Sequence, residues 1–396
     1  MSEGGAPPPR PLPPELLKFL EENHLDPSIY SSSHSVPRYI RVKPGCEGCI
    51  EELEAEINCK AVKVDWLPGF YSLPHDVQIA GTSAYQEGKI YGMDAASGAA
   101  VSALGVSPGD HVLDLCAAPG AKLCMLLDVL GNSGSVTGVD VSQHRLAASR
   151  TLVQKYKLGD RCRLFVADGT TFSLPPSRLH LSEAGKSQSY EDSNTFKEWT
   201  SRRTWKERKL AAKARKNVGL RHFESQNPEL IYYGMHSGVV GQKRDQLYRV
   251  LSGTEISIHG YDKVLVDAEC THDGSIRHIQ KFEHWGWETF QQRVFDAERT
   301  EDSLAFLQLK LLRNGFRLLK AGGTLVYSTC SLTVAQNEDV VDQFMSQNDS
   351  AVLQEIDTAK GWPCKSGRTL GTLRFDPATS HTSGLFVARF TKLTPR

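Results

Sequence analysis

The pattern of apolar and polar residues predicts an α/β fold for most of the chain. From about residue 108, short apolar runs typical of strands alternate with amphipathic stretches typical of helices. The strand-like runs are HVLDLCAA, SVTGVDV, CRLFVAD, YDKVLVDA and GGTLVYSTC, followed by SGLFVARFT at 383–391. This alternation indicates a parallel sheet with helices on both faces. We assign it to a domain over residues 83–392.

Three other segments depart from this pattern. Residues 1–35 are a proline-rich leader, expected to be flexible, that leads into a short helix. Residues 36–82 contain RYIRV, IEELEAEI and VDWLPGFYSL, which predict a small α+β module. Between about 174 and 257, prolines, serines and charged residues replace the periodic pattern of apolar residues. We interpret this stretch as a basic insert in the α/β domain.

Length and composition narrow the class of protein. The chain has 396 residues, 40% of them hydrophobic, and nine cysteines. No run of about 18 apolar residues occurs, so no membrane-spanning helix is expected, and the N-terminus lacks the pattern of a secretory signal. The odd and small number of cysteines argues against a disulfide framework. We expect a monomer in the nucleus or cytoplasm, without membrane association.

The balance of charge conceals one strongly basic segment. Lysine plus arginine is 46 and aspartate plus glutamate is 46, so a uniformly basic surface is excluded. Residues 196–223, however, hold ten lysines and arginines against two glutamates, a net charge of +8 that leaves −8 for the rest. Such a segment would attract nucleic-acid phosphates. A solvated loop or a nuclear-localisation patch would have the same composition.

Polar or small residues follow three successive predicted strands. The first strand ends in a loop from Asp114 to Lys122, the second at Asp140 and the third at Asp168. Ligands of open α/β sheets bind at such strand ends. Dehydrogenases share this arrangement, but the loop lacks the G-x-G-x-x-G that a pyrophosphate requires. A cofactor with an adenosine and no phosphate, such as S-adenosylmethionine, fits better.

Two further strand ends each carry a cysteine. Cys270 follows Asp267 in VDAEC, and Cys330 ends VYSTC. A single buried cysteine is usually a small apolar residue, but a pair on two strand ends beside a cofactor site suggests nucleophilic chemistry.

Together these strings resemble the NOP/SUN-type RNA cytosine-C5 methyltransferases. The resemblance rests on VLDLCAAPGAK, Asp140, Asp168, VDAEC and GGTLVYSTCSLTVAQNEDVV, and it covers about residues 36–175 and 258–392. It implies a class I Rossmann-like methyltransferase domain that uses S-adenosylmethionine, preceded by a small RNA-contacting module. The implied substrate is RNA, with transfer RNA favoured and ribosomal RNA as the alternative.

The resemblance also implies roles for single residues. Asp140 would bind the cofactor's ribose, Asp168 would lie near its adenine, and Asp267 would lie between cofactor and target base. Cys330 would be the nucleophile, and Cys270 would be needed to release the product. The methionine end of the cofactor would be wrapped by one loop, which consists of Cys116, Ala117, Ala118, Pro119, Gly120, Ala121 and Lys122. Lys122 would also supply positive charge that favours a thiolate.

Two departures from the family pattern concern the site. Glu269 stands where the family usually has proline, which removes a fixed φ before Cys270, and Gln336-Asn337-Glu338 replaces the usual Glu-Asn-Glu. The residues alone do not decide which cysteine attacks the base, since related DNA enzymes use the thiol at the earlier strand end. An enzyme acting on DNA or another pyrimidine, and an RNA-binding scaffold with impaired catalysis, are the alternative interpretations.

Other signals are weaker. Cys46-x-x-Cys49 with Cys59 is similar to half of a zinc site, but no second close pair of ligands follows, so we expect no metal. His284-Trp285-Gly286-Trp287 could stack on bases or cap a core. His272 and His278 flank the Cys270 loop and could contact phosphate, although loop histidines are more often incidental.

Overall fold

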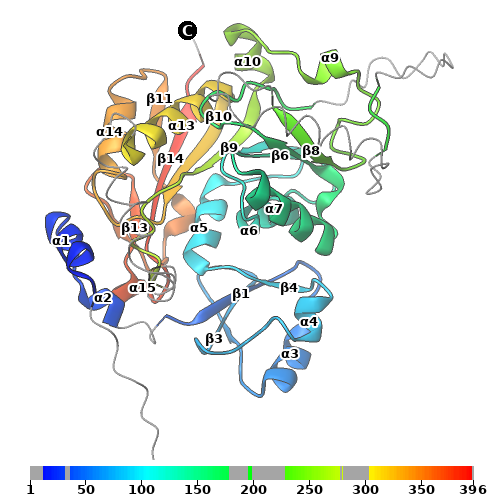
Figure 1. The fold of residues 1–396 in the computed structure, drawn as a ribbon. Coiled ribbons are helices and arrows are strands. Elements are labelled where there is room, and N and C mark those ends of the chain that lie inside the picture. The colour runs from blue at the N-terminus through cyan, green and yellow to red at the C-terminus, as the bar shows by residue number, and fades with distance from the viewer. Residues whose placement is uncertain are drawn as a thin grey trace, which may run out of the picture. The chain divides into compact units, whose positions relative to one another are not determined.

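The computed structural model describes residues 12–31, 36–177, 195–198, 228–276, 279 and 303–394. Its contacts divide the chain into two compact units, and Figure 1 labels many of their elements. Unit 1 consists of Met1–Gly105, Val266–Arg313 and Thr324–Arg396, and unit 2 consists of Val106–Leu265 and Asn314–Gly323.

Unit 1 begins with two helices, α1 (Pro14–Glu22) and α2 (Ser28–Ser31). Leu16, Phe19 and Leu20 recur at helical spacing and form the buried face of α1. They pack in one cluster with Ile276 and Ile279, which follow Cys270 in the chain. The first helix therefore supports the segment after the predicted catalytic loop.

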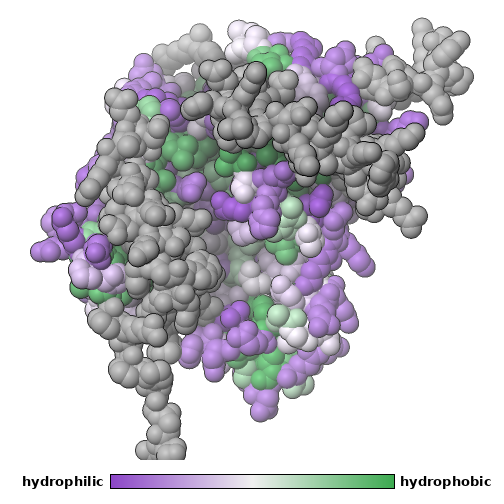
Figure 2. Space-filling view, in the orientation of Figure 1, coloured by the Kyte–Doolittle hydropathy of each residue, from purple (hydrophilic) through white to green (hydrophobic). Residues whose placement is uncertain are grey.

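A four-stranded antiparallel sheet follows, in the order β2-β3-β1-β4. Its elements are β1 (Arg38–Val42), α3 (Cys49–Ile57), β2 (Val62–Lys63), β3 (Phe70–Leu73), α4 (Ser83–Gln86) and β4 (Ile90–Gly92). Ile40 pairs with Tyr71 on one side and with Gly92 on the other. The sheet thus extends past the predicted module boundary at residue 82. Figure 2 shows hydrophilic residues around a small hydrophobic patch on this module.

The helix α5 (Ala95–Leu104) consists almost entirely of small residues and is buried on most of its surface. Asp94 caps it, because its Oδ1 accepts a hydrogen bond from the Ala96 N–H at 3.0 Å. A Cβ on Gly98 would lie 2.4 Å from the Phe70 ring, so glycine is required where the helix meets β3.

Unit 2 contains the parallel strands that the sequence predicts. Its elements are β5 (His111–Asp114), α6 (Ala121–Leu130), β6 (Ser135–Asp140), α7 (Gln143–Lys155), η2 (Gly159–Arg161), β7 (Cys162–Val166), β8 (Glu229–Tyr233), α9 (Arg244–Leu247), α10 (Gly253–His259) and β9 (Tyr261–Asp267), whose last two residues belong to unit 1. β5 pairs in parallel with β9 and β6, and β6 with β7. β6 is buried along its whole length, and α6 and α7 pack side by side on it (Figure 1). The α/β prediction is confirmed.

The predicted insert at 174–257 does not lie wholly outside the sheet, because it contains the strand β8. This strand pairs antiparallel with β7 and covers its edge with the apolar run LIYY. Tyr233 holds the residues that begin the basic segment: its hydroxyl donates to the Lys197 carbonyl at 2.7 Å, and its ring meets the Phe196 ring edge-on at 5.7 Å. Most of the basic segment, residues 199–223, lies outside the described residues.

The last part of the chain returns to unit 1. The elements are α13 (Leu304–Leu318) and β10 (Leu319–Thr329), which each lie partly in unit 2, then α14 (Glu338–Met345), β11 (Ala351–Gln354), η3 (Asp357–Ala359), β12 (Lys365–Ser366), β13 (Leu373–Phe375), α15 (Pro377–Ser380) and β14 (Leu385–Lys392). β14 pairs antiparallel with β10, β11 and β13. Among the residues that the structure describes, no helix is both long and apolar enough to cross a membrane.

Candidate functional site

The two predicted catalytic thiols lie next to each other in unit 1. Cys270 follows the end of β9 and Cys330 follows the end of β10, and their Sγ atoms are 3.2 Å apart. The strand ends are joined by a hydrogen bond from the Ala268 N–H to the Ser328 carbonyl at 2.9 Å. Cys270 is 5% exposed, and Cys330 is half-buried. The structure therefore brings together two thiols that are 60 residues apart in the chain.

His272 completes this group, although its place in the sequence predicts only an incidental loop histidine. Its Nδ1 lies 2.8 Å from the Cys330 Sγ and 3.8 Å from the Cys270 Sγ. Its φ of 57° is in the left-handed region, which few non-glycine residues adopt. Its position two residues after Cys270 was the only signal in the sequence. The imidazole can exchange a proton with either sulfur.

The electrostatics of the group favour a charged pair. Burial raises the pKa of the Cys270 thiol, but the hydrogen bond with Cys330 and the positive charge of His272 outweigh burial, and the pKa lies well below its ordinary value. Burial lowers the pKa of His272, and the negative charge of Cys270 outweighs burial and raises it. The charges of Glu269 and Asp267 also raise the His272 pKa. A thiolate and an imidazolium therefore stabilise each other here.

A buried carboxyl supports the turn that carries His272. Asp273 accepts hydrogen bonds from the Thr271 hydroxyl and, at 2.7 Å, from the Leu332 N–H. Burial raises the pKa of the Asp273 carboxyl above its ordinary value. The Tyr30 hydroxyl donates to the Asp273 carbonyl at 2.7 Å. These bonds join the segments that follow the two cysteines.

The two departures from the family pattern meet in one hydrogen-bond network. The Gln308 Nε2, from α13, donates to the Glu269 carbonyl at 2.8 Å and to the Gln336 Oε1 at 3.2 Å. Gln336 in turn accepts from the Thr271 N–H and donates its Nε2 to the Thr271 hydroxyl at 3.1 Å. An amide can both accept and donate in this way, whereas an ionised glutamate at this position could only accept. The network holds the Cys270 turn without a proline.

Asn337 and Glu338 secure the loop after Cys330. The Thr329 hydroxyl donates to the Asn337 Oδ1 at 2.6 Å, and the Asn337 Nδ2 donates to the Ser331 carbonyl at 2.9 Å. Glu338 is fully buried and forms an ion pair with Arg374. This pairing outweighs the burial that raises the Glu338 pKa, which therefore lies below its ordinary value. These contacts fix the backbone that positions Cys330, the predicted nucleophile.

Asp267, at the end of β9, belongs to the same part of unit 1. Its Oδ1 accepts a hydrogen bond from the Ser328 hydroxyl at 2.7 Å. The Asp267 carboxyl is half-buried, three residues before Cys270. The structure thus holds the predicted base-facing acid on the strand that leads to the thiols.

The glycine-rich segment from Cys116 to Lys122 lies in unit 2, where it follows β5 and ends in the first turn of α6. Gly120 has a φ of 111°, and a Cβ there would lie 2.9 Å from the Ser149 Cα, so only glycine fits against α7. The Asp140 carboxylate accepts from the Ala118 N–H at 3.1 Å and from the Ser142 N–H at 2.8 Å. The structure therefore brings this loop and Asp140 together.

Asp168 is exposed at the end of β7. Its Oδ1 accepts from the Thr170 N–H and hydroxyl, both at 2.8 Å. Asn314 holds the following turn by donating to the Gly169 and Phe172 carbonyls at 2.7 and 2.9 Å. Asp168, which is predicted to lie near the adenine, is thus followed by a turn that hydrogen bonds hold in place.

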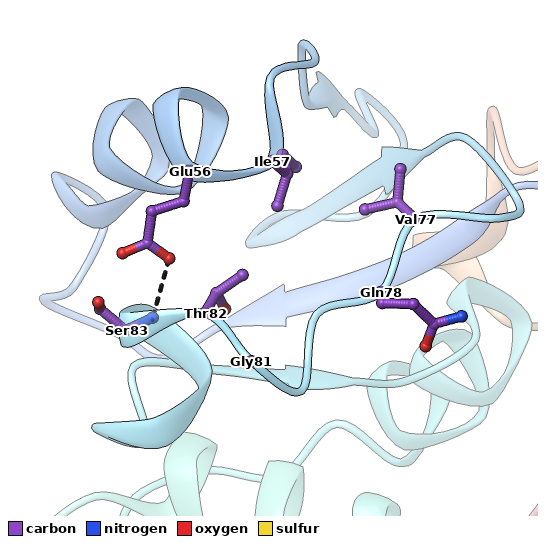
Figure 3. A pocket seen from close by; sticks show the side chains of 7 residues that line it. All are labelled: Glu56, Ile57, Val77, Gln78, Gly81, Thr82 and Ser83. Carbon is purple, nitrogen blue, oxygen red and sulfur yellow. Dashed lines mark hydrogen bonds between the residues drawn. The ribbon is translucent and has the colours of Figure 1, made fainter.

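The remaining candidate residues add no site. His278 and the run His284-Trp285-Gly286-Trp287 lie outside the described residues. Within the described ranges, Cys46, Cys49 and Cys59 belong to no cluster of three potential metal ligands. A surface hollow of about 490 Å³ in the N-terminal module is lined by Glu56, Ile57, Val77, Gln78, Gly81, Thr82 and Ser83 (Figure 3). There the Glu56 Oε2 accepts from the Ser83 N–H at 2.9 Å, and no thiol or imidazole lines the hollow.

Comparison with curated proteins connects this site to RNA methyltransferases. The chain is 22% identical over 359 residues to the tRNA (cytosine(49)-C(5))-methyltransferase of Pyrococcus abyssi, covering 87% of this chain and 85% of the relative. It is 26% identical over 267 residues to the mitochondrial tRNA (cytosine(34)-C(5))-methyltransferase of Danio rerio, covering 67% of this chain and 49% of the relative. The chain matches this relative and three others over only 25% to 49% of their own lengths.

Solved structures share the fold. A methyltransferase homologue from Pyrococcus horikoshii matches with a TM-score of 0.57 and 22% identity, over 96% of this chain and 100% of the other. NSun6 from the same organism, solved with the S-adenosylmethionine analogue SFG, matches with a TM-score of 0.60 and 16% identity, over 97% and 99%. The likeness confirms the Rossmann-like methyltransferase fold.

A protein-family model matches residues 101–179 and 242–391, which together make up more than half of the chain. The match contains the glycine-rich loop, Asp140, Asp168 and both thiols, and it is interrupted where the basic insert lies. The chain therefore belongs to the family described as 16S rRNA methyltransferase RsmB/F.

Proposed function

We propose that this protein transfers a methyl group from S-adenosylmethionine to carbon 5 of a cytidine in RNA. The observation that carries the proposal is the pair of thiols 3.2 Å apart at the ends of β9 and β10, in a chain of the RsmB/F family. An RNA-binding scaffold would not require two thiols and an imidazole in mutual contact. The names of the relatives, as RNA cytosine-C5 methyltransferases, support the same reaction.

The residues of unit 2 fit the cofactor. A carboxylate offers about four acceptor positions, and Asp140 uses two of them for backbone N–H groups, which leaves acceptors for ribose hydroxyls. The loop from Cys116 to Lys122 would hold the methionine end, and Asp168 would lie near the adenine. S-adenosylmethionine supplies an electrophilic methyl group when bound.

Covalent catalysis explains why a thiol is required. Carbon 5 of cytosine is a poor nucleophile, but addition of the Cys330 thiolate to carbon 6 converts the ring to an enamine that is nucleophilic at carbon 5. Once carbon 5 carries the methyl group, loss of its proton and elimination of the Cys330 thiolate restore the aromatic ring. In its protonated form, Asp267 would hydrogen-bond ring nitrogen 3 and withdraw electrons during the addition.

The second thiol, that of Cys270, has its proposed role in the release of the methylated product. Cys270 has a lowered pKa, so its thiolate is available to take a proton beside the base. It lies next to the sulfur that must leave, at 3.2 Å. We assign product release to Cys270 and nucleophilic attack to Cys330.

Transfer RNA is the proposed substrate, with the N-terminal module and the basic insert contacting it. The tRNA methyltransferase of Pyrococcus abyssi matches most of both chains, which favours this class. The target base must leave any stack to meet a thiol and a methyl donor, and single-stranded loops make this inexpensive. A ribosomal RNA substrate is the alternative outcome of the test.

Bisulfite sequencing of total RNA from cells lacking the protein tests the function. We expect specific methylated cytidines to disappear from transfer RNA and to return with the unaltered gene, but not with a Cys330→Ala gene. Loss confined to ribosomal RNA would identify the other substrate. An unchanged methylation pattern, together with failure of the purified protein to bind S-adenosylmethionine, would exclude the proposed reaction.

His272→Gln is expected to slow methylation by on the order of 10²-fold, because Cys330 loses the imidazolium 2.8 Å away whose positive charge stabilises a thiolate beside it. Single-turnover methyl transfer and the rate of iodoacetamide alkylation of Cys330, measured at one pH, should fall together. His236→Gln provides a matched control, since His236 is an exposed residue that pairs with Asp160. Equal rates for the two variants would contradict a role for His272.

Replacing residues 199–223 with a neutral glycine-serine linker of equal length is expected to weaken RNA binding and to flatten its salt dependence. The replaced stretch still carries nine basic residues against one glutamate, and each phosphate contact adds to the salt slope. The design keeps Phe196 and Lys197 in their contacts with Tyr233. RNA binding measured over a range of salt concentrations checks this. An unchanged dependence of the binding constant on salt would show that the segment does not contact RNA.

A further inference from the structure

Three donor atoms suited to a soft metal ion face one another in unit 1. They are the Sγ atoms of Cys270 and Cys330 and the Nδ1 of His272, separated by 3.2, 2.8 and 3.8 Å. All three lie within 4.8 Å of one another, as metal ligands must. The sequence suggests only Cys46, Cys49 and Cys59 as possible ligands, so this cluster is a product of the fold.

The size of the triangle suits a zinc ion. A point equidistant from the three atoms lies about 1.9 Å from each, whereas Zn²⁺ binds sulfur at about 2.3 Å and nitrogen at about 2.0–2.1 Å. An ion at these distances would lie about 1 Å out of the plane of the three atoms. Tetrahedral angles would require the two sulfurs to move apart by roughly half an ångström, and the Cys330 Sγ and the His272 Nδ1 to move apart by roughly 0.7 Å.

We propose that Cys270, His272 and Cys330 form a binding site for a soft divalent metal ion, with Zn²⁺ as the physiological candidate, and that the bound ion reversibly blocks the Cys330 nucleophile. Binding of the ion follows from the geometry alone. The block of catalysis rests on the proposed function.

The ligand types determine which ions compete. Two sulfurs and an imidazole favour zinc over magnesium and calcium, which prefer oxygen ligands. Ligation replaces the protons on the sulfurs, which pass to solvent, with bonds to the ion. Three protein ligands leave a fourth position for water, as in zinc sites that are not purely structural.

The surroundings hold the ligands in place before an ion arrives. The Gly274 N–H donates to the Cys330 carbonyl at 2.9 Å, which ties the segment after His272 directly to the other strand end. Asp273 binds the Leu332 N–H at 2.7 Å, and Gln336 binds Thr271. Such outer contacts fix ligand orientation and thereby raise metal affinity.

A bound ion would make the enzyme inactive without damaging it. The lone pair with which Cys330 attacks carbon 6 would be engaged in the metal bond, and Cys270 would be occupied as well. Removal of the ion by a chelator would restore both thiols. Activity would then depend on the free zinc concentration as well as on RNA and cofactor.

Cobalt(II) titration of the full-length protein, reduced with a non-thiol reductant, tests the site. We expect one equivalent to give the thiolate-to-cobalt absorption and the visible bands of a tetrahedral site. Cys270→Ser, Cys330→Ser and His272→Gln should each weaken binding at least about tenfold. The double variant Cys46→Ser/Cys59→Ser should leave it unchanged. Absence of the bands, or bands that persist in Cys330→Ser, would overturn the site.

Mass-spectrometric mapping of alkylation tests whether zinc blocks Cys330 without any measurement of methyltransferase activity. We expect one equivalent of Zn²⁺ to protect Cys330 and Cys270 from iodoacetamide by at least about tenfold, and a chelator to reverse it. Cys364, a half-buried cysteine outside the cluster, should react equally with and without zinc. Equal alkylation of Cys330 in both conditions would overturn the block. If zinc protects the thiols in a protein that methylates no RNA, the proposed function fails while the metal site stands.

Discussion

Replacing Cys330 with alanine is expected to abolish RNA methylation, with a loss of at least about 10⁴-fold in single-turnover rate, the scale seen when a covalent nucleophile is removed. Without the thiolate, no addition to carbon 6 occurs, and carbon 5 does not become nucleophilic. Transfer of labelled methyl groups from S-adenosylmethionine to RNA measures the loss.

The control for this experiment is Cys364→Ala, which removes a thiol from the same unit outside the cluster. Both variants should bind S-adenosylmethionine as the unaltered protein does, because the loop from Cys116 to Lys122 contains neither change. A Cys330→Ala enzyme that methylates at the normal rate would show that the reaction does not use this nucleophile.

Replacing Cys270 with alanine is expected to trap the protein on its RNA. Cys330 can still attack and the methyl group can still be transferred, but the group 3.2 Å away that assists release is lost. Multiple-turnover methylation should fall by at least about 10²-fold. A band of protein joined to RNA should accumulate on denaturing gels and disappear after treatment with ribonuclease.

The double variant Cys270→Ala/Cys330→Ala separates the two roles, because it should form no adduct at all. If Cys270→Ala turned over normally and Cys330→Ala accumulated the adduct, the assignments of the two thiols would have to be exchanged. The prediction therefore also decides the order that the residues alone left open.

Much of the fold could be predicted because buried parallel strands appear in the sequence as continuous apolar runs. The runs before Asp114, Asp140 and Asp267 correspond to β5, β6 and β9. The proximity of Cys270 to Cys330 could also be anticipated, since the carboxyl ends of neighbouring parallel strands meet at one edge of a sheet. β8 could not, because its short apolar run stands alone in a polar stretch.

The details of the site depend on contacts that no spacing reveals. His272 reaches both thiols because its backbone adopts a left-handed φ and because a second strand end, 58 residues later, supplies Cys330. Gln308 lies 28 residues before Gln336, yet the two hydrogen-bond beside Thr271. The effect of Glu269 in place of proline could not be predicted, because the side chain that binds its carbonyl, Gln308, comes from elsewhere in the chain.

The contact of Phe196 and Lys197 with Tyr233 bears on how RNA affinity can change during evolution. It fixes the chain just before residue 199, and β8 fixes it again from Glu229, so the described residues on both sides of the basic stretch are anchored. The free-energy cost of closing a loop grows slowly, by about 0.6 kcal/mol for each doubling of length. We therefore expect that residues, basic ones included, can be inserted or deleted between these two anchors at little cost in stability and without disturbing Cys270 and Cys330.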